Sequence, residues 1–203
     1  AAYEDFLGRT PGASEVAFQV DAIMRGLTTR ARFLEALAAS PEWLSRIVTQ
    51  LYRDTLGRAP DPVGLATWVS WLQSGRFTVA QTAALFYASA EFYAGLGGGT
   101  PTSWVTTLYS AVLGRAPDPA GLAAWVGYTT NPAYGREWVA AAFYGSLESR
   151  MRRVTNLYAV LLGRAPDPGG LSLWAQEVER SGDLALAVSL AGSPEYALRA
   201  ESR

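Results

Sequence analysis

Apolar residues along the chain recur three and four positions apart, the spacing that places them on one face of an α-helix. Within one stretch of the sequence this pattern appears three times in succession, around Leu44, Leu65 and Val79. It predicts three helices, which we expect over residues 41–56, 62–74 and 78–88. The alternation of apolar and polar positions that is typical of strands is missing from the sequence.

Aspartate and proline mark the points where these helices are expected to begin. An Asp-Pro pair recurs three times, and we expect its aspartate to cap a helix whose first position the proline occupies, at Asp61, Asp118 and Asp167. Ser40 and Ser193 also precede a proline and are expected to cap in the same way. The alternative, a calcium ligand in each loop, fits less well, because calcium takes six to eight oxygens and each loop offers one carboxylate.

The helical pattern belongs to an internal repeat. LGRAPDPVGLATW (56–68), LGRAPDPAGLAAW (113–125) and LGRAPDPGGLSLW (162–174) are nearly identical, and a degraded copy opens the chain at Leu7. Each copy has a tyrosine six residues before its arginine and closes on a Ser-x-Glu element. These landmarks divide the chain into repeat 1 (1–40, degenerate), repeat 2 (41–89), repeat 3 (90–146, with a Gly-rich insertion at 96–101, expected to be a flexible break) and repeat 4 (147–193), followed by the start of a further helix (194–203).

We therefore expect an all-α fold in which four three-helix repeats of about 49 residues form a single domain. The repeats should pack side by side as a tandem array, each burying its apolar face against the next. The chain is either part of a longer protein, or its two ends complement each other. Recurrent tryptophans at fixed register are expected in the core, namely Trp68, Trp125 and Trp174.

Glycine recurs in the first turn of the second helix, at Gly64, Gly121 and Gly170. In a helix glycine costs about 1 kcal/mol relative to alanine. Its return in three copies predicts the close approach of a neighbouring backbone.

An arginine follows each helix-ending glycine, and each Ser-x-Glu element supplies a glutamate. The arginines Arg58, Arg115 and Arg164 have a counterpart in Arg9 even where the first loop has degraded. We interpret them as structural, paired with the glutamates or bonded to loop carbonyls at a junction between helices. The alternative is an arginine that binds a sugar or a carboxylate. The separate cluster Arg150, Arg152 and Arg153 is interpreted as a solvated helix face, since Glu148 lies beside it.

Composition removes most catalytic chemistry. The sequence contains no His, no Cys and no Lys, which excludes imidazole and thiolate chemistry and a lysine Schiff base. The net charge is -1, from 17 basic and 18 acidic residues spread along the chain, so nucleic acid is not an expected partner. The sequence contains no run of eighteen apolar residues, so we expect no membrane insertion. We expect no catalytic residue, no metal site and no cofactor.

Residues present in every copy are explained by the need of each copy to fold, so a binding site should consist of residues that differ between copies. The aromatics outside the repeated pattern are the candidate ligand-binding residues: Trp71, Trp104, Tyr128, Tyr134 and Trp138. Such side chains stack on sugars or anchor a partner protein when exposed. The alternative for them is packing between repeats.

The pattern LGRAPDPxGLxxW, preceded by a tyrosine and followed by Ser-x-Glu-aromatic as in Ser89-Ala90-Glu91-Phe92, resembles the bacterial family called domain of unknown function 4214. That family is distantly similar to the phycobilisome linker domain. The resemblance covers nearly the whole chain and departs in repeat 1, where Thr10–Ser14 replace the Ala-Pro-Asp-Pro run. It implies an extracellular or cell-surface accessory role without established catalysis.

From these observations we expect a non-catalytic secreted or cell-surface module that mediates assembly or attachment through protein contacts. The second hypothesis is a carbohydrate-binding module that binds a cell-surface glycan through exposed non-repeated aromatics. The two hypotheses differ in whether those aromatics line an exposed groove.

Overall fold

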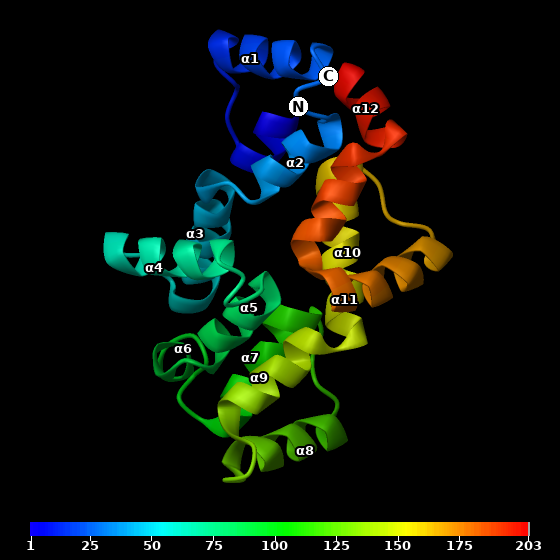
Figure 1. The fold of residues 1–203 in the computed structure, drawn as a ribbon. Helices are drawn as coiled ribbons and strands as arrows, with labels where there is room; N and C mark the ends of the chain where they lie inside the picture. The colour runs from blue at the N-terminus through cyan, green and yellow to red at the C-terminus, as the bar shows by residue number, and fades with distance from the viewer. Residues whose placement is uncertain (203) are drawn as a thin grey trace. The chain divides into compact units, whose positions relative to one another are not determined.

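The computed structural model of the protein describes residues 1–202, and in that range it consists of helices joined by short loops, without strands (Figure 1). This confirms the predicted all-α class. The elements in chain order are the π-helical turn η1 (Tyr3–Leu7), α1 (Ala13–Met24), α2 (Arg30–Ala38), α3 (Pro41–Leu56), α4 (Pro62–Gln73), α5 (Val79–Ala88), α6 (Ala90–Ala94), α7 (Pro101–Leu108), the π-helical turn η2 (Tyr109–Leu113), α8 (Pro119–Thr130), α9 (Gly135–Gly145), α10 (Leu147–Leu162), α11 (Pro168–Gly192) and α12 (Pro194–Glu201).

The helix boundaries agree with the loop chemistry. The helices α3, α4 and α5 occupy the three ranges expected within repeat 2. Asp61, Asp118 and Asp167 each accept a hydrogen bond of 2.8 Å from the backbone N–H three residues ahead. Ser40 and Ser193 cap α3 and α12 in the same way, at 3.2 and 3.1 Å. The predicted caps are therefore confirmed, and α12 is the further helix expected after repeat 4.

The chain forms two compact units. One combines residues 1–46 with the residues from 153 onward, and the other consists of residues 47–152, so the boundaries fall within α3 and α10. Most of repeats 1 and 4 therefore belongs to the first unit, and most of repeats 2 and 3 to the second. The predicted side-by-side array of four consecutive repeats is not confirmed by this division.

The unit of residues 47–152 is built around the third helices of repeats 2 and 3, because α5 packs along α9 (Figure 1). The helix α8 packs against α7 and α9. The recurrent aromatics stack in this core. The ring centroids of Tyr109 and Phe143 lie 5.0 Å apart, and those of Trp125 and Phe143 lie 4.8 Å apart. Tyr52 and Phe86 repeat the first of these contacts at 4.9 Å.

The unit that contains both chain ends repeats this arrangement with repeats 1 and 4. Here α2 packs against α11, which breaks at Gly182, where φ is +82°. Leu34 and Leu37 of α2 are buried, as are Leu186 and Leu190 of α11. A hydrogen bond also joins the first and the last helical elements of this unit. The hydroxyl of Tyr196 in α12 donates to a carboxylate oxygen of Asp5 in η1, at 2.8 Å.

The Gly-rich insertion splits the helix that would correspond to α3 in repeat 3. The helix α6 ends at Ala94, and the chain resumes as α7 at Pro101. Between them the N–H groups of Gly97 and Gly99 donate to carbonyls of Phe92 and Tyr93, at 2.7 and 2.8 Å. The insertion is therefore a hydrogen-bonded turn, although its flexibility stays a prediction.

The recurrent glycine of the second helix makes room for side chains, so the prediction of a neighbouring backbone is wrong. A Cβ added at Gly121 would lie 2.6 Å from the Tyr109 hydroxyl and 2.8 Å from the Asp118 carboxylate. Gly64 has the same two neighbours from its own repeat, at the same distances. At Gly170 only the capping aspartate is close, at 3.0 Å. The glycine thus protects the N-cap and the core tyrosine of its repeat.

This geometry predicts unequal effects of the same substitution. Gly121→Ala should lower the free energy of unfolding, because the added methyl group overlaps Tyr109, although alanine normally stabilises a helix. Gly170→Ala should be much less harmful. Urea unfolding of both variants measures the difference, and an equal effect at the two sites would contradict the explanation.

Candidate functional site

The recurrent arginine and glutamate form a bidentate ion pair in every copy, which confirms their predicted pairing. In repeat 2 the Nε and Nη2 atoms of Arg58 donate to the two carboxylate oxygens of Glu91, at 2.6 and 2.9 Å. Arg115 and Glu148 form the same pair, at 2.6 and 3.0 Å. The equivalent pairs elsewhere are Arg9 with Glu42 and Arg164 with Glu195.

Each of these guanidinium groups also lies over the tyrosine of its own repeat. The distance from Cζ to the ring centroid is 5.1 Å for Arg58 over Tyr52 and 4.9 Å for Arg115 over Tyr109. The contact is a cation–π interaction that joins the end of one helix to the loop after it. Because both carboxylate oxygens and one ring face are occupied, we assign these arginines to the fold rather than to a ligand.

Repeat 1 changes this junction by placing Glu15 where the other copies have glycine. Arg9 donates to both oxygens of Glu15 at 2.9 Å in addition to its pair with Glu42. Glu15 also accepts from the backbone N–H of Gly12, at 2.8 Å, so it binds the N–H at the start of the helix instead of the N–H three residues ahead that the aspartates bind. The hydrogen bond from Arg9 lowers the pKa of Glu15 to about 2. Repeat 1 has therefore kept the Arg–Glu junction and added Glu15 to it.

The junctions predict a dependence of stability on pH. The pKa of Glu42, Glu91, Glu148 and Glu195 is lowered in the folded state, in each case mainly by the hydrogen bond from its arginine. A carboxyl group with a depressed pKa stabilises the fold above its unfolded pKa, and this contribution is lost as the pH falls through the folded pKa. The free energy of unfolding should therefore decrease between about pH 4.5 and about pH 2.

Urea unfolding at several pH values in this window measures that decrease. The Glu15→Gln variant should lose part of it, because its pKa is about 2 in the folded state. An identical slope in the wild type and the variant would show that this carboxylate does not contribute.

The binding of a second recurrent arginine to helix carbonyls was not predicted from the sequence. The Nη1 of Arg152 donates to the carbonyl of Ala111 at 2.7 Å, and that of Arg199 donates to Val160 at 2.9 Å. Both carbonyls lie in the last turn of a helix, where carbonyls lack helical partners and a cation is favourable. The signal was present in the sequence, since an arginine stands four residues after the Ser-x-Glu glutamate at Arg46, Arg152 and Arg199.

The interpretation of the Arg150, Arg152 and Arg153 cluster as a solvated face is wrong. All three are half-buried. The Nε of Arg153 donates to Asp183 at 2.6 Å, and their side chains are only 15% and 14% exposed. Arg152 and Arg153 therefore each connect two helical elements within one unit.

Of the five candidate ligand-binding aromatics, Trp104 is in the core. It has no exposed surface, and its Nε1–H donates to the carbonyl of Tyr87 at 2.9 Å. Trp104 lies five residues before Tyr109, and the residues in the same register of repeats 2 and 4 are Ile47 and Arg153, so the tryptophan is not repeated. Trp104 therefore has a structural role although it is not repeated, and it cannot contact a ligand in this fold.

Trp71 belongs to a half-buried cluster on α4. Its ring centroid is 5.0 Å from that of Trp68 and 5.6 Å from that of Phe77. The guanidinium of Arg76 covers this cluster, with Cζ at 4.8 Å from the Trp71 ring and 5.7 Å from the Phe77 ring. The residues of repeat 2 thus cover their own aromatic cluster.

The remaining three candidates come together on the surface of repeat 3. We call them the repeat-3 patch: Tyr128 at the end of α8, Tyr134 in the following turn and Trp138 in α9. Their ring centroids are 5.1 Å apart for Tyr128 and Tyr134, 5.3 Å for Tyr128 and Trp138, and 4.6 Å for Tyr134 and Trp138. They are 38%, 42% and 43% exposed.

The repeat-3 patch rests on the core, which fixes its position. The half-buried ring of Trp125 lies 5.6 Å from that of Tyr128 and 6.1 Å from that of Trp138. Trp125 in turn contacts Phe143 of the buried core. The patch is therefore an apolar surface held by rigid packing, and the chemistry available to it is stacking and apolar contact.

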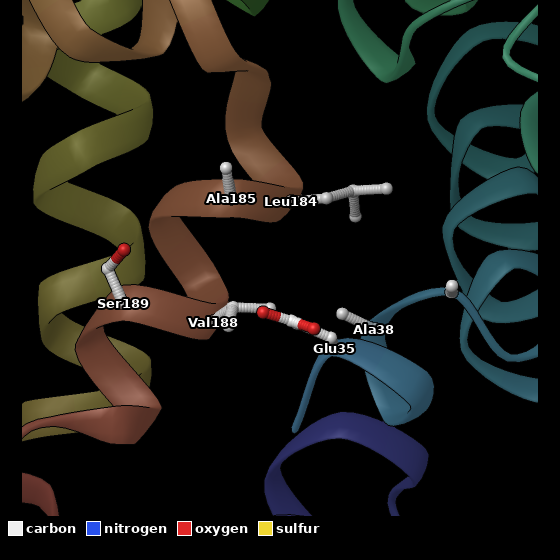
Figure 2. A pocket seen from close by; sticks show the side chains of 7 residues that line it. Glu35, Ala38, Leu184, Ala185, Val188 and Ser189 are labelled. Atoms are coloured by element: carbon white, nitrogen blue, oxygen red, sulfur yellow. The ribbon is translucent and has the colours of Figure 1, made fainter. Parts of the chain in front are cut away.

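An apolar groove lies in the other unit, between α2 and α11 (Figure 2). Its volume is about 310 Å³ and its lining is mostly small and aliphatic, with Glu35 and Ser189 as the polar members. Figure 2 shows Leu184 and Val188 projecting from α11 into the space beside α2. None of the five candidate aromatics lines the groove.

Within residues 1–202, no group of three or more Asp or Glu side chains lies close enough together to hold a metal ion. None of the helices described there has both the length and the hydropathy that crossing a bilayer requires.

Comparison with known proteins finds one family. The family model described as "Domain of unknown function (DUF4214)" matches residues 44–96 and 83–153, two overlapping stretches that together span more than half of the chain. No curated protein and no solved structure matches the chain.

Proposed function

The chain belongs to the family described as domain of unknown function (DUF4214), and we propose that it is a non-catalytic secreted or cell-surface module that mediates assembly or attachment through protein contacts. The observation that carries this proposal is the repeat-3 patch. Tyr128, Tyr134 and Trp138 converge on one exposed surface, and repeat 2 has a glutamine, Gln81, in the register of Trp138. Tyrosine and tryptophan in such clusters dominate the binding energy of protein interfaces.

The orientation of the rings favours a protein partner over a glycan. A sugar stacks on the flat face of an aromatic ring, so several rings in a similar plane suit an extended glycan. In the repeat-3 patch the planes of Tyr128 and Tyr134 are 86° apart, and those of Tyr134 and Trp138 are 51° apart. Tilted rings form an uneven apolar surface, which complements the side chains of a protein.

Other parts of the proposal have different support. The non-catalytic role is supported by the composition, which offers neither His, Cys nor Lys. The secreted or cell-surface location is supported by the family resemblance of the repeat. A side-by-side array of four three-helix repeats also remains a proposal, and its support is the Arg–Glu junction that recurs in all four copies.

The proposal is tested by binding of the labelled protein to isolated cell envelopes of its source organism. The double variant Tyr134→Ser/Trp138→Ser should bind at least about tenfold more weakly than the wild type, the effect of losing an interface hot spot. Protease treatment of the envelopes should abolish binding, whereas periodate oxidation of their glycans should leave it intact.

Phe18→Ser is the matched control, because Phe18 is an aromatic residue of α1 with 69% exposure that lies outside the patch. It should bind as the wild type does. An equal loss in both variants would indicate non-specific apolar adsorption. Binding that survives protease and disappears after periodate, together with a signal on a glycan array, would replace this proposal with the carbohydrate-binding one.

A further inference from the structure

Repeats 2 and 3 contain the same pair of contacting rings in the same register. Tyr109 lies 57 residues after Tyr52, and with this offset Trp71 corresponds to Tyr128 and Phe77 to Tyr134. The ring centroids are 5.6 Å apart with planes at 67° in repeat 2, and 5.1 Å apart with planes at 86° in repeat 3. The ring pair is thus kept in both copies.

The two copies differ in what covers the rings. In repeat 2 the guanidinium of Arg76 lies over both Trp71 and Phe77, and both rings are half-buried. The residue of repeat 3 in the register of Arg76 is Ala133, whose side chain is too short to cover a ring. Tyr128 and Tyr134 are accordingly exposed.

The nearest arginine in the sequence does not replace Arg76. Arg136 is the second residue of α9, and its guanidinium lies 4.4 Å from the ring centroid of Tyr93. The guanidinium of Arg136 therefore packs on Tyr93.

We propose that the repeat-3 patch receives an arginine side chain of the partner protein, which lies over Tyr128 and Tyr134 as Arg76 lies over the equivalent rings of repeat 2. This inference rests on the proposed function, whose partner it describes more closely. A guanidinium suits the site because it is planar, stacks on aromatic faces and is more weakly hydrated than an ammonium.

The geometry also excludes a cage that encloses the cation. The three rings of the patch contact one another, with centroids 4.6 to 5.3 Å apart, which leaves no space for an ammonium group between them. The cation must lie on the outer faces of the rings. Trp138 adds a third ring to this face. Repeat 2 has no ring there, because the residue in the same register is Gln81.

The test compares N-acetylarginine amide with N-acetylcitrulline amide, its neutral isostere, in NMR titrations of the aromatic ring signals. Arginine amide should shift the signals of Tyr128, Tyr134 and Trp138 and bind at least about threefold more tightly than citrulline amide. Equal binding of the two compounds, or shifts confined to other rings, would overturn the inference.

Two substitutions test the relation between the copies. Ala133→Arg should place a guanidinium of the chain itself over the patch and weaken binding of arginine amide at least about threefold, whereas Ala133→Gln should not. Arg76→Ala should uncover Trp71 and Phe77, so that their signals also respond to arginine amide. An unchanged response of the patch in Ala133→Arg would contradict the proposed position of the guanidinium.

The failure of this inference is distinguishable from failure of the proposed function. If envelope binding depends on Trp138 but arginine amide and citrulline amide bind equally, the protein-binding function stands. The proposal that the partner supplies an arginine is then wrong. Conversely, the signals could shift with arginine only while the Tyr134→Ser/Trp138→Ser variant binds envelopes as the wild type does. That result would contradict the proposed function.

Discussion

Replacing Trp104 by alanine should lower the free energy of unfolding by roughly 3 to 5 kcal/mol, the cost of deleting a large aromatic side chain from a core. Trp104 has no exposed surface, and its indole N–H donates to the carbonyl of Tyr87. The substitution leaves a cavity beside α5 and removes the partner of that buried carbonyl. Urea unfolding followed by circular dichroism measures the loss.

Trp138→Ala is the matched control for this prediction. Trp138 is 43% exposed and lies in the repeat-3 patch. Its removal should cost no more than about 1 kcal/mol of stability, as expected for a substitution near the surface. If the two tryptophans cost the same, the division between a core residue and a binding residue would be wrong.

Replacing Asp183 by alanine should destabilise the protein by roughly 3 kcal/mol, because it breaks an ion pair that is largely withdrawn from water. The Arg153–Asp183 contact is 2.6 Å long, and both side chains are about 15% exposed or less. The substitution removes the carboxylate that compensates the charge of Arg153, next to the break of α11 at Gly182.

The exposed pair of Glu177 and Arg180, with a separation of 4.0 Å, provides the comparison. Glu177→Ala should change the free energy of unfolding by less than about 0.5 kcal/mol, since exposed pairs are screened by water. Thermal unfolding of both variants under the same conditions makes the comparison. A similar effect of the two substitutions would contradict the structural role of Arg153 and Asp183.

The helices and their caps could be predicted from the sequence because they depend on local chemistry. The Asp-Pro pairs fix where helices begin through one side chain and one backbone N–H, as Asp61 and Gly64 do. The Arg–Glu junction was predictable because it recurs in every copy. Features that each copy needs for folding are repeated in the sequence, and the repetition identifies them.

The pairing of repeats was not predictable in the same way. All four copies have similar apolar faces, so the sequence does not state which copies pack together. In the structure α5 pairs with α9 and α2 pairs with α11. Trp104 was misassigned because the other copies have no aromatic residue in its register, where repeat 2 has Ile47 and repeat 4 has Arg153.

The candidate binding site was predicted as a set of residues but not as an arrangement. Tyr128 and Tyr134 are separated by a turn whose conformation decides whether their rings meet. The repeated ring pair of Trp71 and Phe77 was the available signal, since it occupies the same register. Arg76 of repeat 2 corresponds to Ala133 of repeat 3, and this difference distinguishes the covered ring pair from the exposed one.

The most direct test of the central claim, that the repeat-3 patch contacts a partner protein, is a site-specific photo-crosslink. Trp138 is replaced by p-benzoylphenylalanine, and Phe18 by the same residue in a separate control. Irradiation on envelopes should give one protein adduct from position 138 and none from position 18. Unlabelled wild-type protein should suppress this adduct, whereas the Tyr134→Ser variant should not. Absence of a protein adduct at position 138, or equal adducts from both positions, would contradict the account.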